Sequence, residues 1–284
     1  MRSNNPVFNR SEAFNGSSAR TQSPYGQSPY GQADPYGQYG DPSQWGTGAP
    51  TQQAPVARMT IDSVVQKTGI TLAVVIVTAM ATWLWAGDAS TWSAEKVGQI
   101  EMAAMAGCGL AFVLSLVNSF KRVVSPALVL AFAAAEGVAL GAISVFFENM
   151  FPGIVTNAVL GTMAAFAGTL AAYKFFDIKL SDKFKRGVMA VVLGMVGLSV
   201  LSLVLSFAGI DMGLFGGGPI GFIFAVLGLV MGVFMLLMDF DFVEQGVAAG
   251  IEERNSWTAA FAMTVSLVWI YTNLLRLLAF FQDD

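Results

Sequence analysis

The chain has 284 residues, of which 55% are hydrophobic and only 12% are charged, whereas a soluble domain carries about 25% charged residues. So few charges cannot coat a globule of this size, so the composition predicts that most of the chain lies in lipid. The net charge of −4 argues against nucleic acid as a partner, because phosphate binding needs a basic surface. The chain has no histidine, which excludes His-ligated zinc and serine–histidine–aspartate catalysis.

Residues 1–57 differ in composition from the rest of the chain. They are rich in Gly, Pro, Ser, Gln and Tyr, and the sequence Ser-Pro-Tyr-Gly-Gln occurs at 23–27 and again at 28–32. Such a segment cannot bury enough apolar surface to offset the entropy lost on ordering. We therefore expect residues 1–57 to form a disordered cytoplasmic tail, with a docking or self-association element as the alternative.

Residues 58–284 are predicted to form a seven-helix transmembrane domain, which makes the chain an all-α membrane protein. Each apolar run is close to the ~20 residues that a helix needs to cross a bilayer, and too long for a spanning strand. Thr60, followed by Asp62 and Ser63, is typical of a helix start. The seven runs lie at about 69–86, 102–120, 127–147, 154–176, 187–208, 219–239 and 257–280.

Basic residues gather in alternate connections between these runs. On the opposite side only Lys96 occurs, in the connection between the first two helices. By the positive-inside rule the N-terminus is therefore expected in the cytoplasm and the C-terminus outside, with the chain in the cell membrane. The basic residues assigned to the cytoplasmic side are Arg58, Lys67, Lys121, Arg122, Lys174, Lys179, Lys183, Lys185, Arg186 and Arg254.

Small residues recur at a spacing of four within several of the apolar runs. The third run contains Gly137 and Gly141, the sixth contains Gly228 and Gly232, and the second contains Gly107 between alanines. Small residues at this spacing let helix backbones approach each other in lipid. We expect these positions to be helix-packing contacts.

Charged groups inside membrane spans are costly, so each is a candidate functional residue. Glu136 lies ten residues into the third helix, roughly 15 Å from its cytoplasmic end. It must be protonated, paired or exposed to a wet cavity. Asp239 and Asp241 are expected to close the sixth helix at the cytoplasmic mouth, with Asp241 solvated at the interface. Arg276 lies near the outer end of the last helix, where its side chain is long enough to reach water.

Enzyme motifs are absent from the sequence. There is no Gly-x-Ser-x-Gly and no His-Glu-x-x-His, and no lysine or carboxylate stands beside an evident nucleophile. We therefore expect no enzymatic activity, no firmly assigned metal site and no cofactor.

Three stretches of this sequence are informative when taken together: residues 126–144, which include Glu136-Gly137, residues 238–242, with Asp239-Phe240-Asp241, and residues 270–278 of the last helix. Together they resemble the Bax inhibitor-1 (transmembrane Bax inhibitor motif) family in its bacterial branch. The resemblance covers about residues 58–281, and residues 1–7 are similar to the start of the bacterial subgroup.

The resemblance implies a bundle with the seventh helix at its centre and a pH-sensitive calcium leak. In the family an aspartate of helix 6 pairs with an aspartate of helix 7 as a cytoplasmic latch, and Asp239 matches the first of these. Helix 7 has no carboxylate here. Its polar side chains are Thr264, Ser266, Thr272 and Asn273, of which Thr272 and Asn273 are the candidate partners. A neutral amide can hydrogen-bond an aspartate, but it cannot supply the coupling between two like charges.

These observations leave three functional hypotheses. The leading one is a pH-sensitive cation leak channel, with calcium as the permeant ion and Glu136 and Asp239 in the ion path or sensing pH. The alternative is a non-conducting membrane regulator that binds other membrane proteins, such as a membrane protease. The third is a proton-coupled transporter that uses the same carboxylates. The bilayer is the common partner in all three.

Overall fold

The computed structural model describes residues 57–121, 124–176 and 178–282. The described ranges contain seven long helices, each long and apolar enough to cross a membrane, which confirms the predicted all-α bundle. The predicted disordered tail lies outside the described residues except for Ala57. The helices are α1 (Ile61–Ala86), α2 (Ala94–Phe120), α3 (Pro126–Met150), α4 (Ile154–Phe175), α5 (Asp182–Phe207), α6 (Pro219–Ala248) and α7 (Asn255–Gln282), and a short 3₁₀ helix, η4 (Ala89–Thr91), joins α1 to α2.

The start of α1 is fixed by its own side chains, as the sequence predicted. The Thr60 hydroxyl accepts a hydrogen bond from the backbone N–H of Ser63, and the Ser63 hydroxyl accepts one from the N–H of Thr60, both at 3.1 Å. This reciprocal pair satisfies two of the backbone donors that the first turn of a helix leaves free. Asp62 adds a negative charge in the first turn, where the helix dipole favours it.

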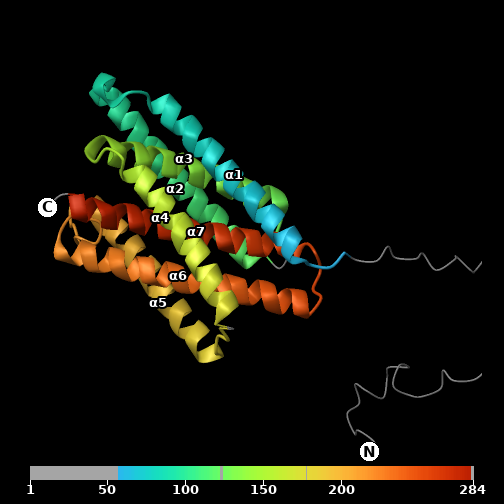
Figure 1. Ribbon diagram of the computed structural model, residues 1–284. Helices are drawn as coiled ribbons and strands as arrows, with labels where there is room; N and C mark the ends of the chain where they lie inside the picture. Colours follow the sequence, from blue (N-terminus) through green and yellow to red (C-terminus); the bar gives the residue numbers. More distant parts are fainter. Residues whose placement is uncertain (1–56, 122–123, 177, 283–284) are drawn as a thin grey trace, which may run out of the picture. The chain divides into compact units, whose positions relative to one another are not determined.

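Helix α7 lies at the centre of the bundle. It packs against α1, α3, α4 and α6, whereas α2 packs mainly on α3 and α5 mainly on α6 (Figure 1). The central position that the family resemblance implied for the seventh helix is therefore confirmed. We call the end of the bundle at which α1 begins the basic end, because Lys67, Lys185 and Arg254 lie there, and the other end the opposite end.

Close helix contacts occur at the glycines that the sequence singled out. A Cβ at Gly137 of α3 would overlap the Thr78 side chain and the Val75 carbonyl of α1. A Cβ at Gly107 of α2 would lie 2.8 Å from the backbone nitrogen of Ala139 in α3. Dispersion between closely packed backbones is a main source of helix association in lipid. These glycines therefore set the spacing of α1, α2 and α3.

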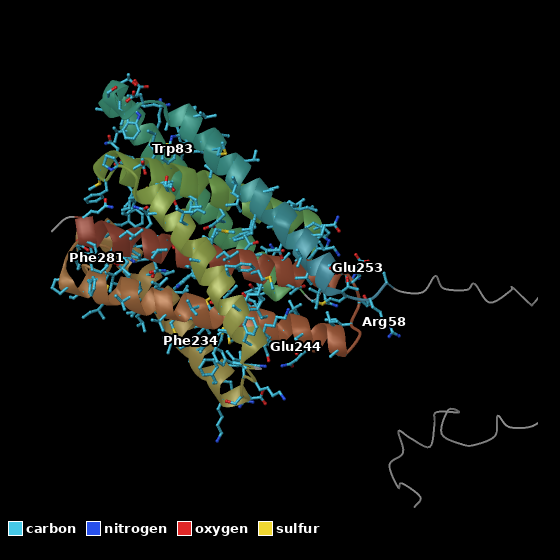
Figure 2. The ribbon with its side chains drawn as sticks, viewed as in Figure 1. Arg58, Trp83, Phe234, Glu244, Glu253 and Phe281 are labelled. Carbon is cyan, nitrogen blue, oxygen red and sulfur yellow. The ribbon has the colours of Figure 1, made fainter. Side chains whose placement is uncertain are left out.

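The segment before α1 pairs with the connection between α6 and α7. Arg58 and Glu252 form an isolated antiparallel bridge, and the backbone N–H of Met59 donates to the carbonyl of Ile251 at 2.8 Å. The Met59 side chain is 2% exposed and belongs to the apolar cluster between α1, α6 and α7. An ion pair of 3.0 Å joins Lys67 to Glu253. Figure 2 shows Arg58 and Glu253 together at this end of the bundle. The chain is thus anchored to α6 and α7 before it enters the first span.

The close contact between α3 and α1 can be tested by comparing the thermal stability of two glycine-to-alanine variants. Gly137→Ala should lower the thermal stability of the detergent-solubilised protein, because overpacking costs roughly 1–3 kcal/mol. Gly194→Ala is the matched control, since Gly194 lies inside α5 with no atom within 4 Å of its Cβ position. There the better helix propensity of alanine should leave stability unchanged or raise it by up to ~1 kcal/mol. Equal melting temperatures for the two variants would contradict the contact.

Candidate functional site

Glu136 lies on the face of α3 that packs against α7. It follows Phe132 by one turn and precedes Leu140 by one turn; Phe132 contacts Phe261 of α7 with ring centroids 5.0 Å apart, and Leu140 clusters with Val268 of α7. Glu136 is ten residues into α3, about 15 Å along the helix axis from the basic end. Its side chain is partly buried, and no described residue forms a hydrogen bond or an ion pair with its carboxylate. A carboxylate at this depth without a protein partner calls for water, a proton or a cation.

Asp239 lies deeper than the sequence indicated. The sixth apolar run ends at this residue, but α6 continues to Ala248, so Asp239 is about 14 Å inside the helix from the basic end. Its carboxylate accepts a hydrogen bond of 2.5 Å from the hydroxyl of Ser266 in α7. Ser266 is 1% exposed and Asp239 is partly buried. This hydrogen bond joins α6 directly to α7.

The two candidate partners in helix 7 are not the residues that the structure brings to Asp239. The Thr272 hydroxyl donates to the carbonyl of Val268, and the Asn273 amide donates to the carbonyl of Trp269, both within α7. Because α6 and α7 are antiparallel, Asn273 lies opposite Gly228. It is seven residues beyond Ser266, about 10 Å further along α7. The partner of Asp239 is therefore a hydroxyl one to two turns closer to the basic end.

Asp241 corrects another expectation, because it is buried and not solvated. It is 6% exposed and forms an ion pair with Lys185 of α5. The Gln245 amide also donates to Asp241, at 2.7 Å. Successive helix residues are about 100° apart, so Asp241 points away from the face that carries Asp239. It ties α6 to α5 and takes no part in the contact with α7.

Glu244 connects the same end of α6 to a third helix. The Tyr173 hydroxyl of α4 donates to the Glu244 carboxylate at 2.5 Å, and Figure 2 shows Glu244 at the basic end of α6. Asp239, Asp241 and Glu244 thus contact α7, α5 and α4 respectively. The three carboxylates hold the basic half of α6 to its neighbours through polar contacts.

Arg276 belongs to the opposite end of the bundle and is remote from both candidate carboxylates. Its guanidinium donates to the carbonyl of Leu214 at 2.5 Å and lies 5.0 Å from the ring centroid of Phe215. A second aromatic ring, that of Phe224, lies at 5.9 Å. These contacts hold the connection between α5 and α6 against α7. They give Arg276 structural partners at the opposite end of the bundle.

Glu136, Asp239 and Ser266 lie at nearly the same depth on three different helices. Ser266 is eleven residues into α7, about 16 Å from the basic end, which is close to the depths of the two carboxylates. Helix α7 contacts both α3 and α6, so the carboxylates lie on two sides of α7. Among the described residues, no three His, Cys, Asp or Glu side chains gather into a metal site.

Ser266 could have been predicted as the partner of Asp239 from the register in which α6 and α7 pair. The connection between the two helices is centred near residue 252, and reflecting Asp239 through that centre gives a position near residue 265. The centre of this connection could not be located from hydropathy, because the charged residues after Asp239 end the apolar run but do not end the helix. Asp241 and its partner Lys185 come from different helices, and no spacing in the sequence indicates that pair.

Comparison with known proteins identifies the family to which this chain belongs. A family model described as Bax inhibitor 1 like matches residues 5–283, so the match extends from within the tail through all seven helices. A search among curated proteins gives no match. The seven spans and the match across nearly the whole chain together identify a multi-pass membrane protein, and the chain belongs to the Bax inhibitor 1 like family.

Proposed function

We propose that this protein is a pH-sensitive cation leak of the cell membrane, with calcium as the permeant ion, and that the described conformation is its closed state. The observation that carries the proposal is the pair of carboxylates, Glu136 and Asp239, at one depth inside membrane-spanning helices. A bundle with a purely structural role would have apolar side chains there. The excess of basic residues at the basic end supports a cytoplasmic location for that end.

Calcium suits such a path because it prefers several oxygen ligands and tolerates irregular geometry. Glu136 is a single carboxylate on its side of α7, so an ion there would have few ligands, bind weakly and leave again, as conduction requires. The Asp239–Ser266 hydrogen bond closes α6 onto α7 in this proposal. Glu136 supplies the negative charge at the depth where a dehydrated ion is hardest to stabilise.

The closed state can be tested with substitutions on the two sides of the hydrogen bond. Asp239→Asn removes the charge and nearly keeps the shape, whereas Ser266→Ala removes the donor. Either change should weaken the α6–α7 contact by about 1–2 kcal/mol and raise calcium flux into liposomes roughly five- to thirtyfold. Thr272→Ala is the matched control, because this hydroxyl of α7 bonds only within its own helix. A flux that rises equally in the control would refute a specific role for the contact.

Glu136→Gln should have the opposite effect on flux. The substitution keeps the size of the side chain and deletes the charge that attracts the ion, so calcium flux should fall. Because the chain has no histidine, a carboxyl must account for any change of flux between about pH 5 and about pH 8. Ionisation of Glu136 on raising the pH should increase flux in the native protein, and Glu136→Gln should flatten this profile. An unchanged pH profile in a folded variant would make Glu136 structural.

Ser266→Asp would test how the contact changes when the hydroxyl that bonds Asp239 is replaced by a second carboxylate. Two carboxylates in hydrogen-bond contact cannot both ionise easily and would share a proton. Flux should then be low at acidic pH, where the shared proton holds α6 and α7 together, and should rise at higher pH, where repulsion separates them. The combined variant Ser266→Asp with Glu136→Gln should retain this new dependence. If the native protein conducts no calcium at any pH, the leak proposal fails and a non-conducting regulator of membrane proteins takes its place.

A further inference from the structure

A second feature of the bundle is an apolar groove of about 300 Å³ on the side where α1 and α4 face each other. Helices α3 and α7 form its floor, and α1 and α4 form its walls. Side chains from all four helices line it, among them Leu72, Trp83, Leu140, Val159 and Val268. Both walls pack against α7, but they leave this space between them. None of the candidate carboxylates belongs to the lining.

The groove runs along the helix axes from the opposite end towards the middle of the bundle. On α1 its lining extends from Leu72 to Trp83, which is about 16 Å of helix. On α4 it begins at Val155, beside the first residue of that helix. The hydrocarbon core of a bilayer is about 30 Å thick. The groove therefore spans about one leaflet, in the direction in which a lipid chain of that leaflet lies.

The hydroxyl groups in the groove already bond within the protein. The hydroxyls of Ser144 and Tyr271 bond each other at 2.6 Å, which joins α3 to α7. The Thr162 hydroxyl donates to the carbonyl of Ala158 at 2.7 Å within α4. A ligand with a charged or strongly polar group would lose its own solvation here without gaining a partner. The lining thus selects a hydrocarbon chain.

We propose that one acyl chain of a membrane phospholipid from the leaflet at the opposite end occupies this groove. Its headgroup stays at the interface beyond Trp83, which Figure 2 shows towards that end of α1. The chain fills the space between α1 and α4 and contacts both, so it replaces the missing helix–helix contact. The site does not depend on ion conduction, because it rests on the shape and chemistry of the lining.

Filling the groove with a side chain tests this proposal. Val159 lines the groove, and its side chain is 47% exposed. Val159→Trp should therefore block the groove without disturbing a packed contact. Leu160→Trp is the matched control, because Leu160 is the next residue of α4, is 63% exposed and is not part of the lining. Met163→Trp is a second blocking variant, one turn further along α4, in case the first fails to fold.

The measurement is native mass spectrometry of the full chain released from nanodiscs of dioleoylphosphatidylcholine. The native protein and Leu160→Trp should retain one phospholipid after mild delipidation, and the blocking variants should show a lipid-bound fraction about tenfold lower. Exchange for dioleoylphosphatidylglycerol should leave retention unchanged, because the groove binds the acyl chain of the lipid and not its headgroup. Equal retention by folded blocking and control variants, retention that follows the headgroup, or a detergent molecule in place of the lipid would overturn the proposal.

Discussion

The structure depends on how α7, the central helix, satisfies its polar side chains inside a membrane. Some of them bond within the helix, as the Thr264 hydroxyl does to the carbonyl of Ala260 and the Asn273 amide does to that of Trp269. Three hydroxyls instead reach neighbouring helices: Ser256 bonds Ser63 of α1, Ser266 bonds Asp239 of α6, and Tyr271 bonds Ser144 of α3. The Trp269 indole also donates to the Gly228 carbonyl of α6. Hydrogen bonds between membrane helices contribute about 0.6–2 kcal/mol each. Together these contacts fix the rotation of α7 relative to α1, α3 and α6, and so decide which side chains face Asp239.

Helix α6 is held differently along its length. Towards the opposite end, Gly228 and Gly232 let it approach α7 closely, with the Cβ position of Gly232 2.7 Å from the Ile270 side chain. Towards the basic end, three carboxylates bind three different helices. A glycine contact cannot be released by a proton or an ion, whereas a carboxylate contact can. The basic half of α6 is therefore the part of the helix that can respond to its ionic environment.

Much of this architecture follows from sequence, because membrane spans and glycine contacts are local signals. The seven apolar runs correspond to the seven helices, and the packing of Gly137 and Gly107 was expected from their spacing. What sequence could not supply was the extension of α6 beyond Asp239, since hydropathy reports where a helix leaves lipid and not where it ends. Because α6 is longer than expected, Asp239 lies opposite Ser266 of α7 and not opposite Thr272 or Asn273. The burial of Asp241 depends on Lys185 of another helix. The apolar groove depends on the space left between α1 and α4, which no pattern within either helix indicates.

The pairing of Asp239 with a hydroxyl separates two tasks that a pair of aspartates would combine. Two coupled carboxylates hold a latch closed and also respond to pH, because each changes the protonation of the other. A serine hydroxyl closes the contact between α6 and α7, but it does not titrate in the physiological range and has no charge to repel Asp239. In the proposed leak, protonation of Asp239 alone would weaken its bond to Ser266, and the second titrating carboxyl is Glu136, at the same depth on the other side of α7. A change of charge there acts on the face of α7 that carries Val268 and Phe261, and rotation of this helix would move Ser266 relative to Asp239. The central helix is thus the physical link between the sensing carboxylate and the closing contact.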